Sequence, residues 1–147
     1  LLVMNRESGS IEHKKFYNIV DYLYKEFNIQ ISLKEAQNII DSDGILQKRG
    51  RKLDISPIVK QFTKQYIKDV LELLEEKYGE YLDSIDGVVI VGGGAYFFKK
   101  YINLNDKEIM DEIQKHFDIS FLQMPEDLSE YYNAYSYLKA AELKLKN

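Results

Sequence analysis

Residues 87–102 read GVVIVGGGAYFFKKYI, and they predict a strand, a glycine turn and a helix in succession. The apolar run 88–91 is bounded by glycine on both sides, which predicts a strand over residues 87–91 with both faces buried. The glycines at 92–94 then let the backbone turn sharply and approach a group that a side chain would block. A helix over residues 95–102 should follow, because apolar residues stand at positions 97, 98, 101 and 102. The free N–H groups at the start of such a helix suit a phosphate, so the pattern indicates a nucleotide.

The glycine triplet by itself fits two interpretations. It differs from the dinucleotide-binding pattern G-x-G-x-x-G, because Phe97 stands where the third glycine would be, and no Gly-Lys-Ser/Thr follows it as in a P-loop. One interpretation is a turn that contacts a nucleotide. The other is a non-enzymatic α/β protein-interaction module, in which the glycine turn serves packing only. The local sequence leaves both open.

The neighbouring elements extend the pattern. A long amphipathic helix precedes the strand, and Pro125 and Asn133 follow it near a terminal helix. This order resembles the actin-like ATPases, and most of all the bacterial plasmid-partition (ParM-like) proteins. The resemblance covers residues 1–145 as a series of elements, and the glycine motif is its specific part. The residues that carry it are Val88-Val89-Ile90-Val91-Gly92-Gly93-Gly94-Ala95, Met124-Pro125 and Tyr131-Tyr132-Asn133-Ala134-Tyr135-Ser136-Tyr137-Leu138.

The resemblance implies a fold, a ligand and an assembly. The fold would be α/β: an actin-like (ribonuclease H-like) domain, with a mixed sheet flanked by helices and a small inserted α+β subdomain. Gly92, Gly93, Gly94 and Ala95 would lie against ATP or GTP, which the full-length protein would bind with Mg²⁺. That protein would assemble into filaments and segregate plasmid or other DNA, with a DNA-bound adaptor protein as a partner.

Catalysis is expected only in a larger protein. In the family, hydrolysis needs a magnesium-binding Asp-x-Gly loop from each half and a water-orienting residue in the other domain. None of these segments occurs in this sequence, so we expect neither catalytic nor metal-binding residues in it. The apolar opening Leu1-Leu2-Val3-Met4 starts in mid-strand. We therefore expect the chain to be the C-terminal half of a two-domain ATPase.

Composition limits the alternatives. Of the 147 residues, 45% are apolar and 30% are charged, which fits a globular domain with its own core. The net charge of −4 argues against direct nucleic-acid binding as the main role. The absence of cysteine excludes a disulfide framework and a thiolate metal site. No apolar run approaches the roughly 18 residues of a membrane span, so we expect a cytoplasmic protein without membrane contact.

Apolar periodicity and turn residues predict the elements before the glycine motif. Ser32 and Glu35 form a capping box that opens the second of two helices. Ser56 should cap a long helix with Pro57 as its first residue, ending at about residue 78 with Gly79 as its stop. The inner stripe of this long helix is expected to be Ile58, Phe62, Tyr66, Val70, Leu73 and Leu74. The other expected elements are strands at 1–5 and 10–14, helices at 15–27 and 32–43, and a hairpin of strands 45–48 and 52–55 around Arg49-Gly50-Arg51.

After the motif, a helix at 106–116, a strand at 119–123 and a terminal helix opened by Pro125 are expected. The tyrosines of that terminal helix, Tyr131, Tyr132, Tyr135 and Tyr137, should form a core-facing stripe. We expect a single domain over residues 1–147, in which residues 15–55 form the inserted subdomain and residues 1–14 and 56–147 form the core.

Three polar motifs have ordinary explanations. Lys48–Lys52 holds four cations in five residues, and a solvated hairpin tip is favoured over a contact with phosphate, nucleic acid or a neighbouring subunit. The histidines, His13 and His116, lack any metal-ligand spacing and are expected at the surface. The stretch 41–44 lacks the glutamate of a calcium loop and is expected to end a helix.

Overall fold

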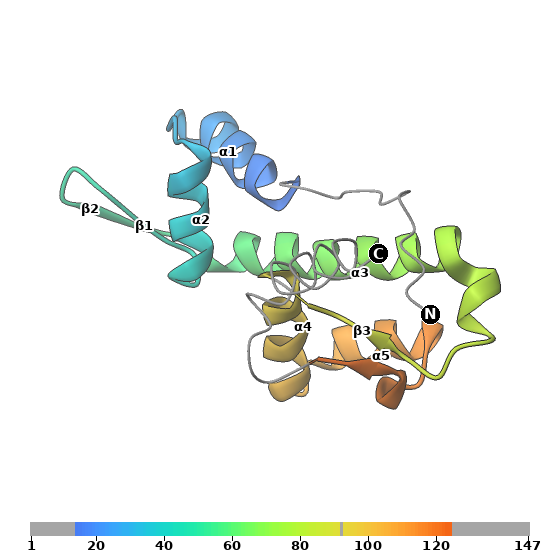
Figure 1. Cartoon of the computed structure of the whole chain (residues 1–147). Helices are drawn as coiled ribbons and strands as arrows, with labels where there is room; N and C mark the ends of the chain where they lie inside the picture. Colours follow the sequence, from blue (N-terminus) through green and yellow to red (C-terminus); the bar gives the residue numbers. More distant parts are fainter. Residues whose placement is uncertain (1–13, 92, 125–147) are drawn as a thin grey trace, which may run out of the picture. The chain divides into compact units, whose positions relative to one another are not determined.

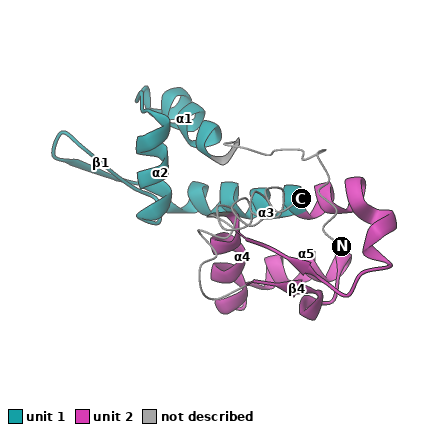
Figure 2. Cartoon of the chain, viewed as in Figure 1, with its two compact units in different colours: residues 1–70 teal, residues 71–147 magenta. Residues whose placement is uncertain are grey.

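The computed structural model describes residues 14–91 and 93–124. The chain divides into two compact units, residues 1–70 and residues 71–147, which Figure 2 shows in different colours. The long helix α3 (Ser56–Leu82) contributes to both units. The strand predicted at 1–5, most of that at 10–14, and the terminal helix with its four tyrosines lie outside the described residues.

The first unit begins with two amphipathic helices, α1 (Lys14–Phe27) and α2 (Leu33–Asp41), which pack against each other (Figure 1). Both were predicted, although Lys14, expected to end a strand, is the first residue of α1. Ile19 and Leu23 of α1 are fully buried, α2 has a buried apolar face that consists of Ala36, Ile39 and Ile40, and the two helices are in contact. The spacing of three and four residues explains why the pattern was readable from the sequence.

The capping box at the start of α2 is present as predicted. The Ser32 hydroxyl accepts a hydrogen bond from the Glu35 backbone N–H at 3.2 Å, and the Glu35 carboxylate accepts one from the Ser32 backbone N–H at 2.7 Å. The bond from this backbone N–H holds the pKa of Glu35 below its ordinary value. Two of the free N–H groups at the helix start are satisfied in this way.

Removing the cap should lower stability by a modest amount, and in a pH-dependent manner. Ser32→Ala is expected to lower the free energy of unfolding by about 1 kcal/mol. A carboxylate whose pKa is lowered on folding adds stability above its unfolded pKa, and this stability is lost as the pH falls through the folded value. Wild type should therefore lose more stability than Glu35→Gln below about pH 4.5. Urea denaturation at pH 7 and pH 3 measures both effects, and equal acid losses in the two proteins would contradict the assignment.

The predicted hairpin forms, with β1 (Ile45–Lys48) antiparallel to β2 (Arg51–Asp54). Its turn has two residues rather than the expected three, because Arg51 belongs to β2 and pairs with Lys48. Arg49 and Gly50 make the turn with φ values of 51° and 74°. A two-residue turn with positive φ at both positions matches the twist of the strands, which is why it replaces a longer loop.

The long helix α3 was predicted with two boundary errors. Ser56 is its first residue rather than its cap, and the Asp54 carboxylate accepts a hydrogen bond from the Ser56 N–H at 2.9 Å. At the other end the helix continues through Gly79 to Leu82. A helix-ending glycine takes a positive φ, and Gly79 does not. Gly79 is therefore an interior helix residue.

The prediction of which residues of α3 face the core was also wrong: the buried residues form the neighbouring row, one position further along the helix. The six predicted residues are only half-buried, and the buried row consists of Val59, Thr63, Ile67 and Leu71, with the buried Ile55 just before the helix. Apolar residues occupy two adjacent rows of this helix, so periodicity alone did not distinguish them. Thr63 fits the buried row because its hydroxyl donates to the Val59 carbonyl within the helix at 3.0 Å.

The second unit contains a parallel strand pair, β3 (Val88–Val89) and β4 (Leu122–Gln123), in which Val88 pairs with Leu122. Between them lie α4 (Gly93–Asn103) and α5 (Lys107–His116), the latter capped by Asp106 and matching the helix predicted at 106–116. The strand expected at 119–123 is shorter. Its first three residues form the 3₁₀ turn η1 (Ile119–Phe121), because the Asp118 side chain accepts hydrogen bonds from Ser120.

The prediction of a strand over 87–91 with both faces buried was wrong in its extent. β3 has two residues, Val88 is half-buried, and Val89 is 51% exposed. Within the described residues β3 pairs with β4 alone, and the pleat turns Val89 to the face opposite Val88. The parallel pairing with intervening helices is nevertheless the α/β arrangement that was expected.

Candidate functional site: the glycine turn between β3 and α4

The candidate site is the connection from β3 to α4 in the second unit. Beyond β3, the Ile90 N–H donates to the Gln123 carbonyl at 2.9 Å, so the pairing with β4 extends toward the glycines. A Cβ at Gly87, just before β3, would lie 3.0 Å from the Phe121 carbonyl oxygen. This glycine permits a close approach of two backbones, and its role is packing.

α4 starts two residues earlier than predicted, so Gly93 and Gly94 are its first two residues. Gly92 lies outside the described residues. No carboxylate occupies the first turn of α4, so no acidic side chain there offsets the positive end of the helix. Glycine at these positions has no side chain of its own to cover the backbone N–H groups of the first turn, which suits the approach of an anion.

Burial of the following residues fixes the direction of α4. Ala95 is fully buried, and Phe97, Phe98 and Tyr101 are nearly so, which confirms three of the four apolar positions read from the sequence. Tyr96 points outward instead and is about half exposed. The helix is thus anchored by its apolar face, and its first turn is held directly after β3.

These residues fit the phosphate part of a nucleotide and not a metal ion. Glycine N–H groups and a helix N-terminus are donors for a phosphate. In residues 14–91 and 93–124, no three His, Cys, Asp or Glu side chains are grouped so that they could hold a metal. A magnesium ion bound with a nucleotide takes one or two protein carboxylates besides the phosphates, and the first turn of α4 supplies no carboxylate for it.

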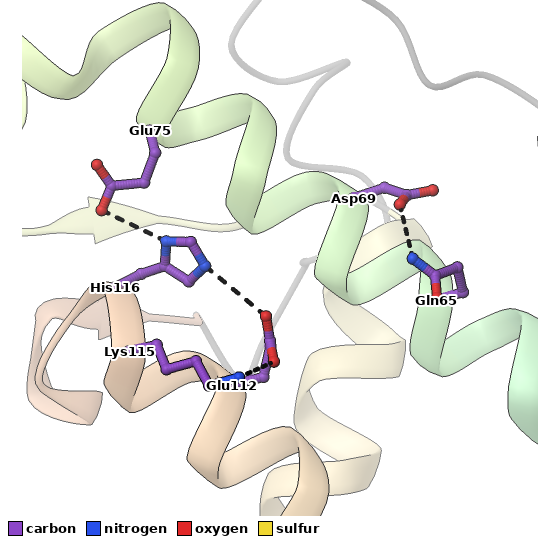
Figure 3. A network of polar contacts seen from close by, with 6 residues as sticks. All are labelled: Gln65, Asp69, Glu75, Glu112, Lys115 and His116. Atoms are coloured by element: carbon purple, nitrogen blue, oxygen red, sulfur yellow. Dashed lines mark hydrogen bonds and ion pairs between the residues drawn. The ribbon is translucent and has the colours of Figure 1, made fainter.

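His116 is not the isolated surface residue that the sequence indicated. Its side chain is 16% exposed, and its Nδ1 lies 3.4 Å from Glu75 Oε1 of α3. Its Nε2 lies 3.9 Å from Glu112 Oε1, and Glu112 in turn pairs with Lys115 at 3.1 Å (Figure 3). Within the second unit this cluster joins α5 to the end of α3, as a structural contact that spacing along the chain did not reveal.

A second concave region, which sequence reasoning missed, lies in the first unit. A groove of about 800 Å³ runs between the α1–α2 connection and the hairpin. Lys48 reaches across it, donating to the Gln30 carbonyl at 2.8 Å and pairing with Glu35 at 3.5 Å. The cation cluster at the hairpin tip is thus not wholly solvated, because one of its members is tied to α2 and to the connection.

Comparisons with known proteins give one family and two individual relatives. A family model described as the C-terminal part of the archaeal MreB-like actin homologues matches residues 4–104. A solved structure of the pCBH ParM non-polymerisable quadruple mutant has a TM-score of 0.59 and 17% sequence identity, covering 88% of this chain and 35% of that one. An S-adenosylmethionine:tRNA ribosyltransferase-isomerase from Fusobacterium nucleatum is 38% identical over 55 residues, which cover 32% of this chain and 15% of that protein.

The two relatives are much longer than the part that this chain matches. The chain spans about a third of the ParM chain and a smaller share of the tRNA-modifying enzyme. The structural likeness confirms the predicted actin-like α/β fold. The match to the enzyme is too short to place the chain in that enzyme's family. No helix in the described ranges is long and apolar enough to span a membrane.

Proposed function

We propose that this chain forms the nucleotide-binding half of a filament-forming ATPase, because it belongs to the family of archaeal MreB-like actin homologues and matches their C-terminal part. The observation that carries the proposal is the position of the β3–glycine–α4 unit inside the matched residues 4–104. In this proposal residues 15–55 are an inserted subdomain, and residues 1–14 and 56–147 form the domain core.

The ligand of the glycine turn is ATP or GTP, bound with Mg²⁺ in the full-length protein. Gly92, Gly93, Gly94 and Ala95 are the residues against which a phosphate or the adenosine would lie. Gly93 and Gly94 supply backbone N–H groups in a helical first turn without a carboxylate. Ala95 contributes by anchoring that turn, since it is fully buried.

The assembly is a filament of identical subunits in the cytoplasm, used to segregate plasmid or other DNA through a DNA-bound adaptor protein. The solved ParM relative is a non-polymerisable mutant, which supports polymerisation as the behaviour to test. The net charge of −4 is in keeping with an adaptor rather than direct contact with DNA.

The full-length protein provides the direct test. Incubated with Mg-ATP, it should release phosphate and pellet in the ultracentrifuge, and both should depend on the nucleotide. A full-length protein that binds neither ATP nor GTP would overturn the proposal.

This chain alone should bind Mg-ATP weakly. Actin-like nucleotide sites are clefts between two domains, so one half supplies only part of the contacts. A helix N-terminus contributes roughly 1 kcal/mol when exposed, and immobilising the nucleotide opposes binding. We expect a Kd in the millimolar range or weaker, on the order of −4 kcal/mol, and no turnover above background. Calorimetric titration and a phosphate-release assay measure these two quantities, and micromolar binding would mean that a complete site lies within the chain.

A further inference from the structure

The groove of the first unit is lined by apolar side chains, which we call its floor (Ile29, Leu46 and Leu53), and by cationic side chains, which we call its mouth (Lys48, Arg49 and Arg51). Its lining comes from the α1–α2 connection on one side and from the hairpin on the other, and consists of Asn28, Ile29, Gln30, Leu46, Lys48, Arg49, Arg51 and Leu53. The strand register explains this order. Leu46 pairs with Leu53, and Lys48 pairs with Arg51, so all four side chains lie on the same face of the hairpin.

Two arginines at the mouth have no counter-charge in the part of the chain that the structure describes. Arg49 and Arg51 form no ion pair within residues 14–91 and 93–124, whereas Lys48 is paired with Glu35. Lys48 and Arg51 also stand directly opposite each other, which is unfavourable for like charges. An anion in the groove would relieve this repulsion.

Arg49 carries a further sign of function. It occupies a turn position with φ of 51°, where asparagine, aspartate or glycine is the residue that such a hairpin turn favours. An arginine in this conformation is uncommon and costs stability. The sequence therefore has an arginine at the groove mouth, although the positive φ of this turn position favours asparagine, aspartate or glycine.

The complementary surface occurs in the second unit of the same chain. Residues 80–86 read EYLDSID, with three carboxylates and no cation. Glu80, Asp83 and Asp86 form no ion pair among the residues that the structure describes. Between them stand two exposed apolar side chains, Tyr81 at 64% and Ile85 at 43% exposure. An apolar anchor flanked by carboxylates matches an apolar floor flanked by arginines.

We infer that the groove of one subunit receives the segment 80–86 of a second copy of this chain. Tyr81 and Ile85 cover Leu46 and Leu53, while the carboxylates meet Arg49 and Arg51. The two surfaces are different parts of the chain, so the contact can repeat head to tail from copy to copy, and in the proposed filament it does so without closing into a ring. The inference rests on the proposed filament function and names the surfaces that join neighbouring subunits.

Neutral substitutions in the full-length protein test the groove. Arg49→Asn together with Arg51→Gln removes both unpaired charges, and asparagine suits the positive φ of the turn, so the hairpin should be kept. The critical concentration for assembly in Mg-ATP, measured by sedimentation, should rise about tenfold, and more steeply at low salt. Lys52→Gln is the matched control, because Lys52 pairs with Gln47 on the opposite hairpin face, and it should change the critical concentration by less than about twofold.

A charge exchange between the two surfaces is the sharper test. One variant carries Arg49→Asp and Arg51→Glu, and the other carries Glu80→Lys and Asp83→Lys. In a polymer of either variant alone, the groove and the segment 80–86 would carry like charges, so neither variant should assemble. In a mixture, the groove of each variant meets a segment of opposite charge on the other, so the two should co-assemble. Far-UV circular dichroism and thermal unfolding establish that each variant is folded.

The outcomes separate this inference from the proposed function. Wild type that assembles, with neutral variants that assemble equally well, overturns the groove contact and leaves the filament intact. Failure of the two folded exchange variants to co-assemble overturns it as well. Full-length protein that binds Mg-ATP but stays monomeric overturns the contact while nucleotide binding stands.

Discussion

Gly44→Ala is expected to lower the free energy of unfolding by about 4 kcal/mol, a large part of the stability of a typical domain. Gly44 joins α2 to β1 with φ of 98°, a conformation that an alanine adopts only with strain. A Cβ there would also lie 2.4 Å from Ser56 Cα and 2.6 Å from Ser56 N. These are backbone atoms at the start of α3, so no side chain can rotate away to make room.

The backbone at Gly44 cannot shift easily, because both its N–H and its carbonyl group are hydrogen-bonded. Its N–H donates to the Ile39 carbonyl at 2.7 Å, and its carbonyl accepts from the Ile55 N–H at 2.8 Å. Urea denaturation followed by circular dichroism measures the loss. Gly50→Ala is the matched control, since Gly50 also has positive φ but no atom within 4 Å of its added Cβ, and about 1 kcal/mol is expected there. Equal losses in the two variants would show that the clash with Ser56 does not matter.

The elements that could be predicted from the sequence are those with local causes. α1, α2 and α5 bury one face at helical spacing, and Ser32 and Asp106 cap the last two through side chains within three residues. The turn after α2 was also predicted from residues 41–44. In the structure Asp43 and Gly44 both have positive φ there. Such patterns are complete within a few residues, so no tertiary information is needed to read them.

Some of the errors have tertiary causes, whereas the two-residue hairpin turn and the 3₁₀ turn η1 have local ones. How deeply each row of α3 is buried depends on which neighbours pack there, and even the half-buried Phe62 has such a neighbour in Tyr22 of α1, with ring centroids 6.2 Å apart. His116 gained two carboxylate neighbours, one of them on α3, about forty positions away in the chain. Spacing along the sequence does not encode such contacts.

The candidate site divides in the same way. Gly93, Gly94 and Ala95 were predicted as a group, because strand, glycine run and helix are consecutive, and the structure places the three in the first turn of α4. Their contact with a nucleotide stays a prediction. The groove could not be predicted, because its walls, residues 28–30 and 46–53, meet only after α2 and the hairpin fold.

Gly93→Val should abolish measurable nucleotide binding in the full-length protein, at least a 100-fold loss, or roughly 3 kcal/mol. Gly93 is the first residue of α4, a position where valine is tolerated by the helix backbone. The loss would therefore come from occupied space: a branched side chain at this position stands where a phosphate or the adenosine must approach the backbone N–H groups. Calorimetric titration with Mg-ATP measures the affinity.

The control must separate lost binding from lost folding. Lys107→Val puts the same β-branched residue at the first position of α5, in the same unit and on an exposed site, so a general effect of valine at a helix start would appear there as well. Both variants should unfold at nearly the temperature of wild type, and only Gly93→Val should lose nucleotide. Equal affinity in a folded Gly93→Val would remove the turn from the nucleotide site. A Gly93→Val that unfolds while Lys107→Val does not would favour the other interpretation of the triplet, in which glycine is needed there for packing between β3 and α4.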